Sequence, residues 1–297
     1  MARLKASIQR VSRCPALPRR PAEGHKGLFG RVLVVGGSGD MIGAPVFAGT
    51  AALRMGSGLV QIAVPEGIIG LCLSITPELI GLGLGDSPVE RSLIEAAEKA
   101  DAIVIGPGLG QSDGARRRLA RLWRLDKPMV VDADGLNLIA AMGKWPGDFA
   151  AKAVLTPHPG EMARLIPLIG KRDVPTDEAG RINLAVAAAV AFGQVIVLKG
   201  ARTVVTDGKR VFVNDTGDST LSKAGTGDVL SGMIGCLLGQ KMDRFDAAAL
   251  GVHLHGLAGE FAGKIHGQRC ALAREVIDAI PEAVRSMERT GRRKLPR

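Results

Sequence analysis

The sequence predicts a single α/β domain built on a mostly parallel β-sheet with helices on both faces. Short, continuous apolar segments alternate with helical patterns along the chain, as expected for strands that are buried on both faces. Hydrophobic residues make up 46% of the 297 residues, enough for a large core. Because residues 26–284 contain no linker and no internal repeat, we expect one domain there, between a basic arm (1–25) and a basic tail (285–297).

The elements of this domain follow from local patterns, taken in chain order. Apolar residues at 31–35 run directly into Gly36-Gly37-Ser38-Gly39 and predict a first buried strand. Similar runs predict strands at 59–64, 102–105, 129–131, 153–155 and 195–198, and longer patterns predict helices at 44–55, 87–99, 115–122 and 176–192. Segments 203–206 and 210–213 flank Asp207-Gly208, which predicts a hairpin. From Asp228 onward the pattern is helical.

The net charge of +10 is concentrated at the two ends of the chain. Residues 1–31 carry +7 and residues 285–297 carry +5, which leaves −2 for the remainder. The body therefore has no overall basic field to attract nucleic acid. Aromatic residues make up only 3% and Tyr is absent, so the stacking platforms of single-stranded nucleic-acid binders are missing too. We expect solvated tails and no nucleic-acid partner.

The cysteines and the apolar runs indicate the compartment. The four cysteines lie far apart and form no CxxC pair, so neither structural zinc nor a disulfide framework is expected, and a reducing cytoplasm fits. The apolar run 184–193 is too short to span a bilayer. The N-terminal arm is rich in arginine like a transit peptide, but its prolines would break the amphipathic helix of such a peptide. We therefore expect a cytoplasmic protein without a membrane partner.

Polar and glycine-rich residues follow five of the predicted strands. They occupy positions 36–39, 106–110, 132–134, 156–158 and 199–200. Because ligands of parallel α/β sheets bind where the strands end, these residues predict one site. The first loop misses the GxGxxG spacing and no acidic residue ends the second strand, so a dinucleotide-binding redox domain is not favoured. The sequence also lacks the GxxxxGK[ST] motif of Walker-type nucleotide sites.

The strongest chemical signal is Gly225-Thr226-Gly227-Asp228, which begins an apolar helix. Glycines let the backbone approach an anion closely, and the free N–H groups of a helix start point at it. The alternative is ordinary helix capping. The motif matches the anion hole of ribokinase-like kinases, in which the Asp takes the proton of the substrate hydroxyl and backbone amides hold the transferring phosphate. The resemblance makes Asp228 the catalytic base and Gly225, Thr226 and Gly227 the anion hole.

Further motifs resemble those of the ADP/ATP-dependent NAD(P)H-hydrate dehydratases, a ribokinase-like family. They lie, in order, at residues 26–30, 36–38, 43–45, 52–60, 106–110, 132–137, 156–161, 198–203 and 251–256. Their ordered combination, over roughly residues 25–275, is far more specific than any single motif. The resemblance implies a ribokinase-like fold and a homo-oligomer, with a tetramer favoured. We do not expect the hydrate epimerase half of the two-domain repair proteins, because the chain is too short to hold it.

The resemblance also assigns binding roles, residue by residue. It gives the phosphate donor, ADP or ATP, to Lys199, Gly200, Ala201, Arg202, Thr203 and Gly227. It gives the hydrated NADH or NADPH to Ala44, Gly108, Gly110, His158 and Asp228, with the choice among the glycines of 106–110 left open. Glu161 would position Mg²⁺ through water. The plainer interpretations are a loop histidine for His158 and a strand-closing surface lysine for Lys199.

Two departures from the family's pattern leave substrate fit and the preference for ADP or ATP open. Met41 stands where the family usually has a Tyr before the Gly-Ala of its first loop. Ser222-Lys223 replace the family's usual residues before the anion hole, and Lys223 adds a positive charge near the phosphate site.

The function implied by the resemblance is metabolite repair, the dehydration of (6S)-hydrated NADH or NADPH. Phosphorylation of the ring hydroxyl, with Asp228 as base, would turn a poor leaving group into a good one, and elimination of phosphate would restore the dihydropyridine. One alternative is a thiazole- or pyrimidine-alcohol kinase of the same fold, which would leave a stable phosphoester. Another is a nucleotide-binding sensor without turnover, against which the intact Asp228 argues.

Overall fold

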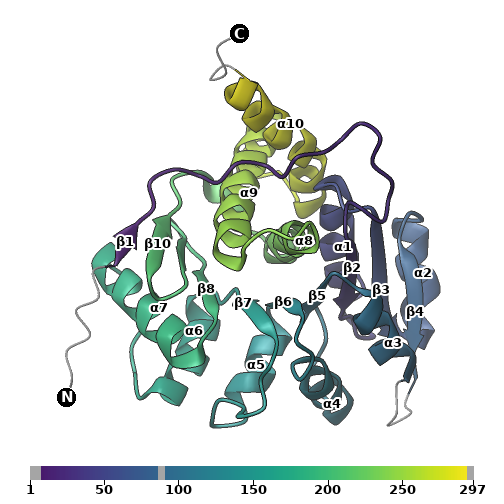
Figure 1. Cartoon of the computed structure of the whole chain (residues 1–297), viewed down its shortest axis with the longest axis horizontal. Coiled ribbons are helices and arrows are strands. Elements are labelled where there is room, and N and C mark those ends of the chain that lie inside the picture. The colour runs from purple at the N-terminus through teal and green to yellow at the C-terminus, as the bar shows by residue number, and fades with distance from the viewer. Residues whose placement is uncertain (1–7, 86–90, 293–297) are drawn as a thin grey trace.

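The computed structural model describes residues 8–85 and 91–292, and its centre is a ten-stranded sheet (Figure 1). The strands are β1 (Gln9–Arg10), β2 (Arg31–Val35), β3 (Leu59–Pro65), β4 (Ile80–Leu84), β5 (Ala102–Ile105), β6 (Pro128–Val131), β7 (Lys152–Leu155), β8 (Val195–Leu198), β9 (Val204–Thr206) and β10 (Arg210–Val213). They lie in the order β1-β10-β9-β8-β7-β6-β5-β2-β3-β4. Within the described sheet, every pairing is parallel except those of β9 with β8 and β10.

Helices cover both faces of the sheet, as Figure 1 shows. One face packs against α1 (Gly43–Arg54), α2 (Ile69–Ile75), α8 (Thr226–Gly239), α9 (Arg244–His266) and α10 (Ala273–Arg292). The other face packs against α3 (Arg91–Lys99), α4 (Asp113–Leu122), α5 (Asp134–Ala140), α6 (Pro159–Leu165) and α7 (Glu178–Phe192). Short 3₁₀ segments are η1 (Glu66–Ile68), η2 (Ile166–Ile169) and η3 (Ser219–Leu221). This arrangement confirms the predicted fold class.

The two helical layers explain why the strands are apolar without interruption. In β2, Val32 and Val34 belong to the core beneath α1 and α8, whereas Leu33 and Val35 belong to the core on the opposite face. Successive side chains of a strand point to opposite faces, so a strand covered on both sides needs an apolar residue at every position. The pattern in the sequence is therefore a direct consequence of the layered fold.

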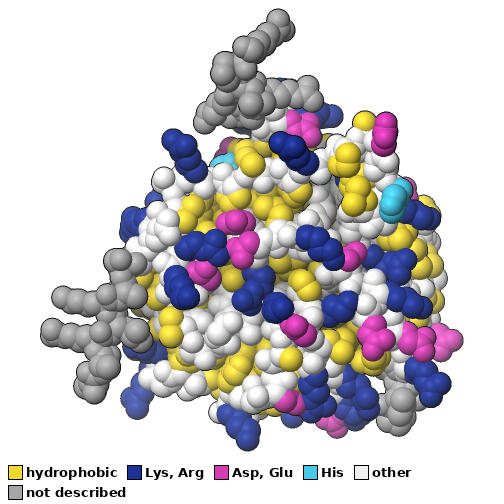
Figure 2. All heavy atoms as spheres, in the orientation of Figure 1, with side chains coloured by type: hydrophobic (Ala, Val, Ile, Leu, Met, Phe, Trp, Pro, Cys, Tyr) yellow, Lys and Arg dark blue, Asp and Glu magenta, His cyan; other side chains and the backbone are white. Residues whose placement is uncertain are grey.

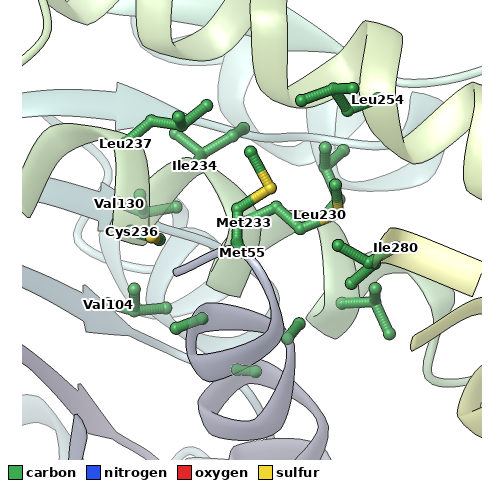
Figure 3. Close-up of a cluster of buried hydrophobic side chains, with 14 of the residues drawn as sticks. Met55, Val104, Val130, Leu230, Met233, Ile234, Cys236, Leu237, Leu254 and Ile280 are labelled. Carbon is green, nitrogen blue, oxygen red and sulfur yellow. The ribbon is translucent and has the colours of Figure 1, made fainter. Parts of the chain in front are cut away.

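Helix α8 lies at the centre of one core and is apolar on all its sides. Figure 3 shows its residues Leu230, Met233, Ile234 and Leu237 among Val104 and Val130 of the sheet, Met55 after α1, Leu254 of α9 and Ile280 of α10. A helix without a polar stripe is stable only where other elements surround it. The position of α8, and of the loop that begins it, is therefore set by packing from every direction.

Glycines in α8 allow this packing to be unusually close. A Cβ atom at Gly232 would lie 1.9 Å from the carbonyl oxygen of Ala48 in α1, and one at Gly235 would lie 2.3 Å from a methyl carbon of Val104. The backbone of α8 thus rests directly against α1 on one side and against β5 on another.

The segment that precedes β2 is attached to the domain over its described length. Strand β1 extends the sheet beside β10, and the chain then crosses α9 and α10 (Figure 1). Val11, Cys14 and Leu17 pack against the core, and Arg20 donates to the carbonyl of Gly56 at 2.7 Å. At the other end, α10 continues to Arg292, so the predicted boundary at residue 284 lies within this helix.

The distribution of surface charge and the composition of the helices concern the expectation that the protein has no nucleic-acid or membrane partner. Figure 2 shows Lys and Arg side chains spread over the visible face and interspersed with Asp and Glu. Within the described ranges, none of the helices combines the length and the apolar character needed to cross a bilayer. The four cysteines are free, two of them buried in the core.

Most predicted elements are confirmed, with boundaries that differ by few residues. Strands 31–35, 102–105 and 195–198 have the predicted ends, and the hairpin at Asp207-Gly208 forms between β9 and β10. The predicted helix 87–99 is seen from Arg91, because its first residues lie outside the described ranges. β1, β4, α2, α5 and α6 were not predicted, and β1 is only two residues long. β4 alternates Gly with apolar residues, which weakens any strand pattern, and each of these helices is only seven residues long.

Replacement of Gly232 with Ala should destabilise the protein by about 1–3 kcal/mol, because the new methyl group would collide with the backbone of α1. Gly70→Ala is the matched control, since Gly70 is an exposed helical glycine with open space around its Cβ position. This control should be neutral or stabilise the fold by up to ~1 kcal/mol. Urea unfolding at unchanged m-value measures both changes. A Gly232→Ala protein as stable as the parent would contradict the close packing.

Candidate active site

The five strands with polar or glycine-rich ends are neighbours in the sheet. They form the continuous parallel set β8-β7-β6-β5-β2. The loops that follow them therefore gather at one edge, as the sequence predicted. The start of α8 reaches the same edge, because Ser231 in its second turn donates a hydrogen bond of 2.5 Å to Asp132 after β6.

A buried ion pair joins the ends of the central strands. Lys199, which directly follows β8, donates to Oδ1 of Asp132 at 2.8 Å, and its side chain is only 17% exposed. The same ammonium lies 3.6 Å from Oε2 of Glu161 in α6. The second oxygen of Asp132 accepts the Ser231 hydrogen bond. Lys199, at the end of β8, therefore contacts the residue that follows β6 and a residue of α6 directly. It is connected to α8 through Asp132.

The charges of Lys199, Asp132 and Glu161 shift one another's pKa values. Burial alone would raise the pKa of Asp132, but Lys199 and the hydroxyl of Ser231 lower it below its ordinary value. Burial likewise opposes the charge of Lys199, yet Asp132 and Glu161 raise the pKa of that amine. The pKa of Glu161 is raised, first by burial and then by the negative charge of Asp132, despite the opposing effect of Lys199. The Lys199–Asp132 pair is therefore ionised.

Asp228 lies in the first turn of α8, beside this pair. Its pKa is raised to about 8, first by burial and next by the negative charge of Asp132. Lys199 opposes the shift, whereas Glu161 adds to it. A carboxyl group whose pKa is near neutrality suits general-base work, because it can both accept a proton and release it at physiological pH.

The loop that begins α8 has the geometry of an anion site. Gly225 adopts a left-handed backbone (φ 90°), and a side chain there would collide with the ring of Phe47 in α1. The hydroxyl of Thr226 lies 2.8 Å from the carbonyl oxygens of both Leu221 and Lys223, which share its single hydrogen, and this contact fixes the turn. Among the described atoms we find no partner for the backbone N–H groups of Gly227 and Asp228. They are available to an anion at the helix N-terminus.

A pocket of about 740 Å³ opens next to this loop. Its lining includes all six residues predicted to bind the phosphate donor, namely Lys199, Gly200, Ala201, Arg202, Thr203 and Gly227. Thr226 and His158 also line it. The structure therefore brings the predicted donor residues together, and it adds His158 to them, although we predicted His158 as a substrate residue.

Three of the other predicted substrate residues, Ala44, Gly108 and Gly110, form a second group beyond the ends of β2 and β5, outside the lining of this pocket, whereas Asp228 lies in α8. A Cβ atom at Gly108 would lie 3.1 Å from that of Ala44 at the start of α1, so these residues are adjacent. The amide of Gly110 donates to Asp134 at 2.9 Å. The anion loop lies between the two groups, since Gly225 faces α1 whereas Gly227 faces Lys199.

His158 and Glu161 have a structural task as well. Nδ1 of His158 accepts hydrogen bonds from the amides of Gly160 and Glu161, and Oε2 of Glu161 accepts one from the amide of His158 at 2.7 Å. This reciprocal arrangement caps α6. Within residues 8–85 and 91–292, no group of three or more His, Cys, Asp or Glu side chains is placed to hold a metal ion.

Both departures from the family's pattern lie in the site. Met41 is 49% exposed and borders Gly108 in the second group. Lys223 lines the pocket, and its ammonium donates to the carbonyl of Arg269. These positions are suited to altering substrate fit and donor preference respectively.

Two residues in the site had no predicted role. The motif 132–134 was recognised, but its sequence did not reveal that Asp132 pairs with Lys199. Ser231 could have been found, because a position three residues after Asp228 shares its helix face. A further mark of the site is Ala133, whose left-handed backbone (φ 47°) is rare for a residue with a side chain.

Comparison with known proteins finds similarity to enzymes that act on NAD(P)H hydrate. The family model for NAD(P)H-hydrate dehydratase matches residues 32–282. A bifunctional NAD(P)H-hydrate repair enzyme of Moorella thermoacetica is 42% identical over 283 residues, which cover 92% of this chain and 52% of that protein. The corresponding enzyme of Escherichia coli is 40% identical and is covered to 50%. The chain thus spans about half the length of the curated relatives it matches.

A solved structure matches over nearly its whole length. The ADP/ATP-dependent NAD(P)H-hydrate dehydratase of Bacillus subtilis, co-crystallised with ATP and Mg²⁺, superposes with a TM-score of 0.79 at 34% identity. The match covers 92% of this chain and 95% of that one. With the family model matched over most of the chain, these similarities show that the protein belongs to the NAD(P)H-hydrate dehydratase family and has a ribokinase-like fold.

Proposed function

We propose that this chain converts the (6S) hydrates of NADH and NADPH back to NADH and NADPH, with ADP or ATP as phosphate donor. The observation that carries the proposal is the carboxyl group of Asp228, whose pKa is raised to about 8 and which lies in the anion loop at the start of α8. The pocket lined by the predicted donor residues lies on one side of this loop, and Ala44 and Gly108 lie on the other. A base between a phosphate donor and a hydroxyl-bearing substrate is the arrangement that phosphoryl transfer requires.

The reaction has two chemical steps. Asp228 accepts the proton of the ring hydroxyl while that oxygen attacks the terminal phosphorus of the donor. An oxygen–phosphorus bond forms and the bond to the nucleotide's bridging oxygen breaks. The ring nitrogen then assists the departure of phosphate, and loss of a proton from the adjacent carbon creates the double bond of the dihydropyridine. The amides of Gly227 and Asp228, together with Lys199, would balance the charge of the transferring group.

The charges in the site suit a donor that arrives with magnesium. Lys199 already shares its charge between two carboxylates, so it balances a polyphosphate only in part. Mg²⁺ commonly binds phosphate oxygens, waters and one or two carboxylates. Both oxygens of Glu161 contact His158, and we therefore propose that Glu161 holds the ion through water. Magnesium would supply charge neutralisation at the phosphates. A homo-oligomeric assembly, with a tetramer favoured, and a cytoplasmic location stay predictions.

The proposed function is tested by incubating the protein with Mg²⁺, ADP or ATP, and hydrated NADPH. The near-ultraviolet absorbance of reduced nicotinamide should return, and phosphate should be released in equal amount. The S epimer should react and the R epimer should not, because its hydroxyl points away from the base. If both donors leave the hydrate untouched but a thiazole or pyrimidine alcohol is phosphorylated, the protein is a kinase. Tight nucleotide binding without either reaction would instead indicate a sensor.

Asp228→Asn should lower turnover by about two to four orders of magnitude, since a positioned base contributes that much. Nucleotide binding and thermal stability should be retained, because the substitution removes a carboxyl group that burial and Asp132 already disfavour in its charged form. Asp113→Asn is the control, as Asp113 is an exposed acidic residue in the first turn of α4. Turnover near the parent's in Asp228→Asn would remove Asp228 from the mechanism, and an unfolded variant would indicate a capping role.

The activity should depend on the ionisation of Asp228. The base works only when deprotonated, and its pKa lies above the ordinary value, so activity should be lost as the pH falls through about 8 rather than through about 4. Asp132→Asn removes the charge that contributes most after burial, and the inflection should then move to lower pH. Asp126→Asn, at an exposed ion pair with Lys152, should leave it in place. A flat profile between about pH 6 and pH 9 would contradict the assignment.

A further inference from the structure

One arginine outside the pocket holds the loop that carries the donor-binding residues. Arg181, in the first turns of α7, reaches beneath the chain that follows β8. Its Nη1 donates to the carbonyl of Ala201 at 2.5 Å, and its Nη2 donates to the carbonyls of Leu198 and Lys199, both at 3.2 Å. Arg181 itself is absent from the pocket lining. A single guanidinium thus collects three carbonyl oxygens of this loop on the side of α7.

The guanidinium of Arg181 is charged when it donates to these carbonyls. Burial lowers the pKa of Arg181, and Glu178 partly restores it, but an arginine so close to carbonyl oxygens stays protonated. In the described part of the chain, no carboxylate lies within ion-pair distance of Arg181. Its charge is therefore directed at backbone carbonyls, and the planar fork of donors suits several acceptors at once.

The same loop leaves its amides unused. The backbone N–H groups of Gly200, Ala201 and Arg202 make no hydrogen bond with another described residue, and all three residues line the pocket. Gly200 and Arg202 both have positive φ angles, 138° and 54°. Successive backbone amides without protein partners are potential donors to an anion. The loop that lines the pocket therefore combines carbonyls bonded to Arg181 with amides that have no protein partner.

Gly200 fits this arrangement closely. A Cβ atom at this position would lie 3.0 Å from Nη2 of Arg181, so a side chain there would push the guanidinium away from the loop. The glycine is thus needed for contact with Arg181 as well as for its own backbone conformation.

We propose that Arg181 is a positioning residue for the phosphate donor. By holding the carbonyls of Leu198, Lys199 and Ala201, it turns the amides of residues 200–202 toward the phosphates of the bound nucleotide. Without it, these carbonyls are free to rotate toward the pocket and present partial negative charge to a polyanion. The inference rests on the proposed function in one respect, namely that this pocket receives the nucleotide.

The test compares Arg181→Met and Arg181→Lys with the parent protein. Calorimetry measures the binding of a non-hydrolysable ATP analogue with Mg²⁺ and the binding of adenosine. Steady-state turnover assays give the KM for the donor and the KM for the hydrate. Arg181→Met should weaken binding of the analogue about ten-fold or more, as expected for loss of charge-assisted hydrogen bonds that shape a site. Binding of adenosine and the KM for hydrate should change little. Arg181→Lys keeps the charge but loses the planar set of donors, so its affinity for the analogue should lie between those of the parent and Arg181→Met. Millimolar guanidinium should partly restore the affinity of Arg181→Met for the analogue.

Arg244→Met provides the matched control. Arg244 is similarly half-buried and donates to Gln194 at 2.8 Å and to the carbonyl of Ala153, which lies near the opposite ends of the strands. Its loss should lower the melting temperature while the affinity for the analogue stays unchanged.

Four results would overturn the inference. Unchanged affinity in Arg181→Met would show that the loop does not depend on Arg181, and parent-like affinity in Arg181→Lys would show that charge alone matters. Equal losses for analogue, adenosine and hydrate, without rescue by guanidinium, would indicate a purely structural role. If the parent binds no nucleotide, the inference falls together with the proposed function. If it binds nucleotide in an Arg181-dependent way but leaves hydrate unreacted, only the proposed function fails.

Discussion

The ion pair between Lys199 and Asp132 joins, at the carboxyl edge of the sheet, elements that are far apart in the chain. Lys199 follows β8 and Asp132 follows β6, while Ser231 brings in α8 and Glu161 brings in α6. Because the pair is buried, removal of either partner leaves an uncompensated charge, a loss that typically costs about 3–5 kcal/mol. The relative positions of the strand ends and of the anion loop therefore depend on this contact.

The same pair sets the chemistry of its neighbour. Lys199 keeps Asp132 ionised in spite of burial, and the negative charge of Asp132 then raises the pKa of Asp228. A single cation among several carboxyl groups makes this corner of the site unfavourable for a further negative charge. Backbone amides become important for that reason, since they stabilise phosphate without adding a titrating group. Gly227 of the anion loop and residues 200–202 line the same pocket.

Close packing of α8 against α1 connects this chemistry with the rest of the fold. Gly232 lets the helices approach until the backbone of one meets the backbone of the other. The approach brings Gly225 against Phe47 of α1, and so places the anion loop beside the residues at the ends of β2 and β5. The family model matches the chain from β2 to within α10, which includes both packed helices and the whole candidate site.

The sequence alone determined the α/β class, most strands, the shared edge and the anion motif, because these depend on local periodicity and on glycine and proline chemistry. It also led to the family through ordered motifs. Only the tertiary structure decided that Lys199 pairs with Asp132, that His158 lies with the donor residues, and that Arg181 holds their loop. These partners are separated by tens of residues, and no spacing rule links them. They meet because parallel strands, joined by helical crossovers, bring distant segments to one edge of the sheet.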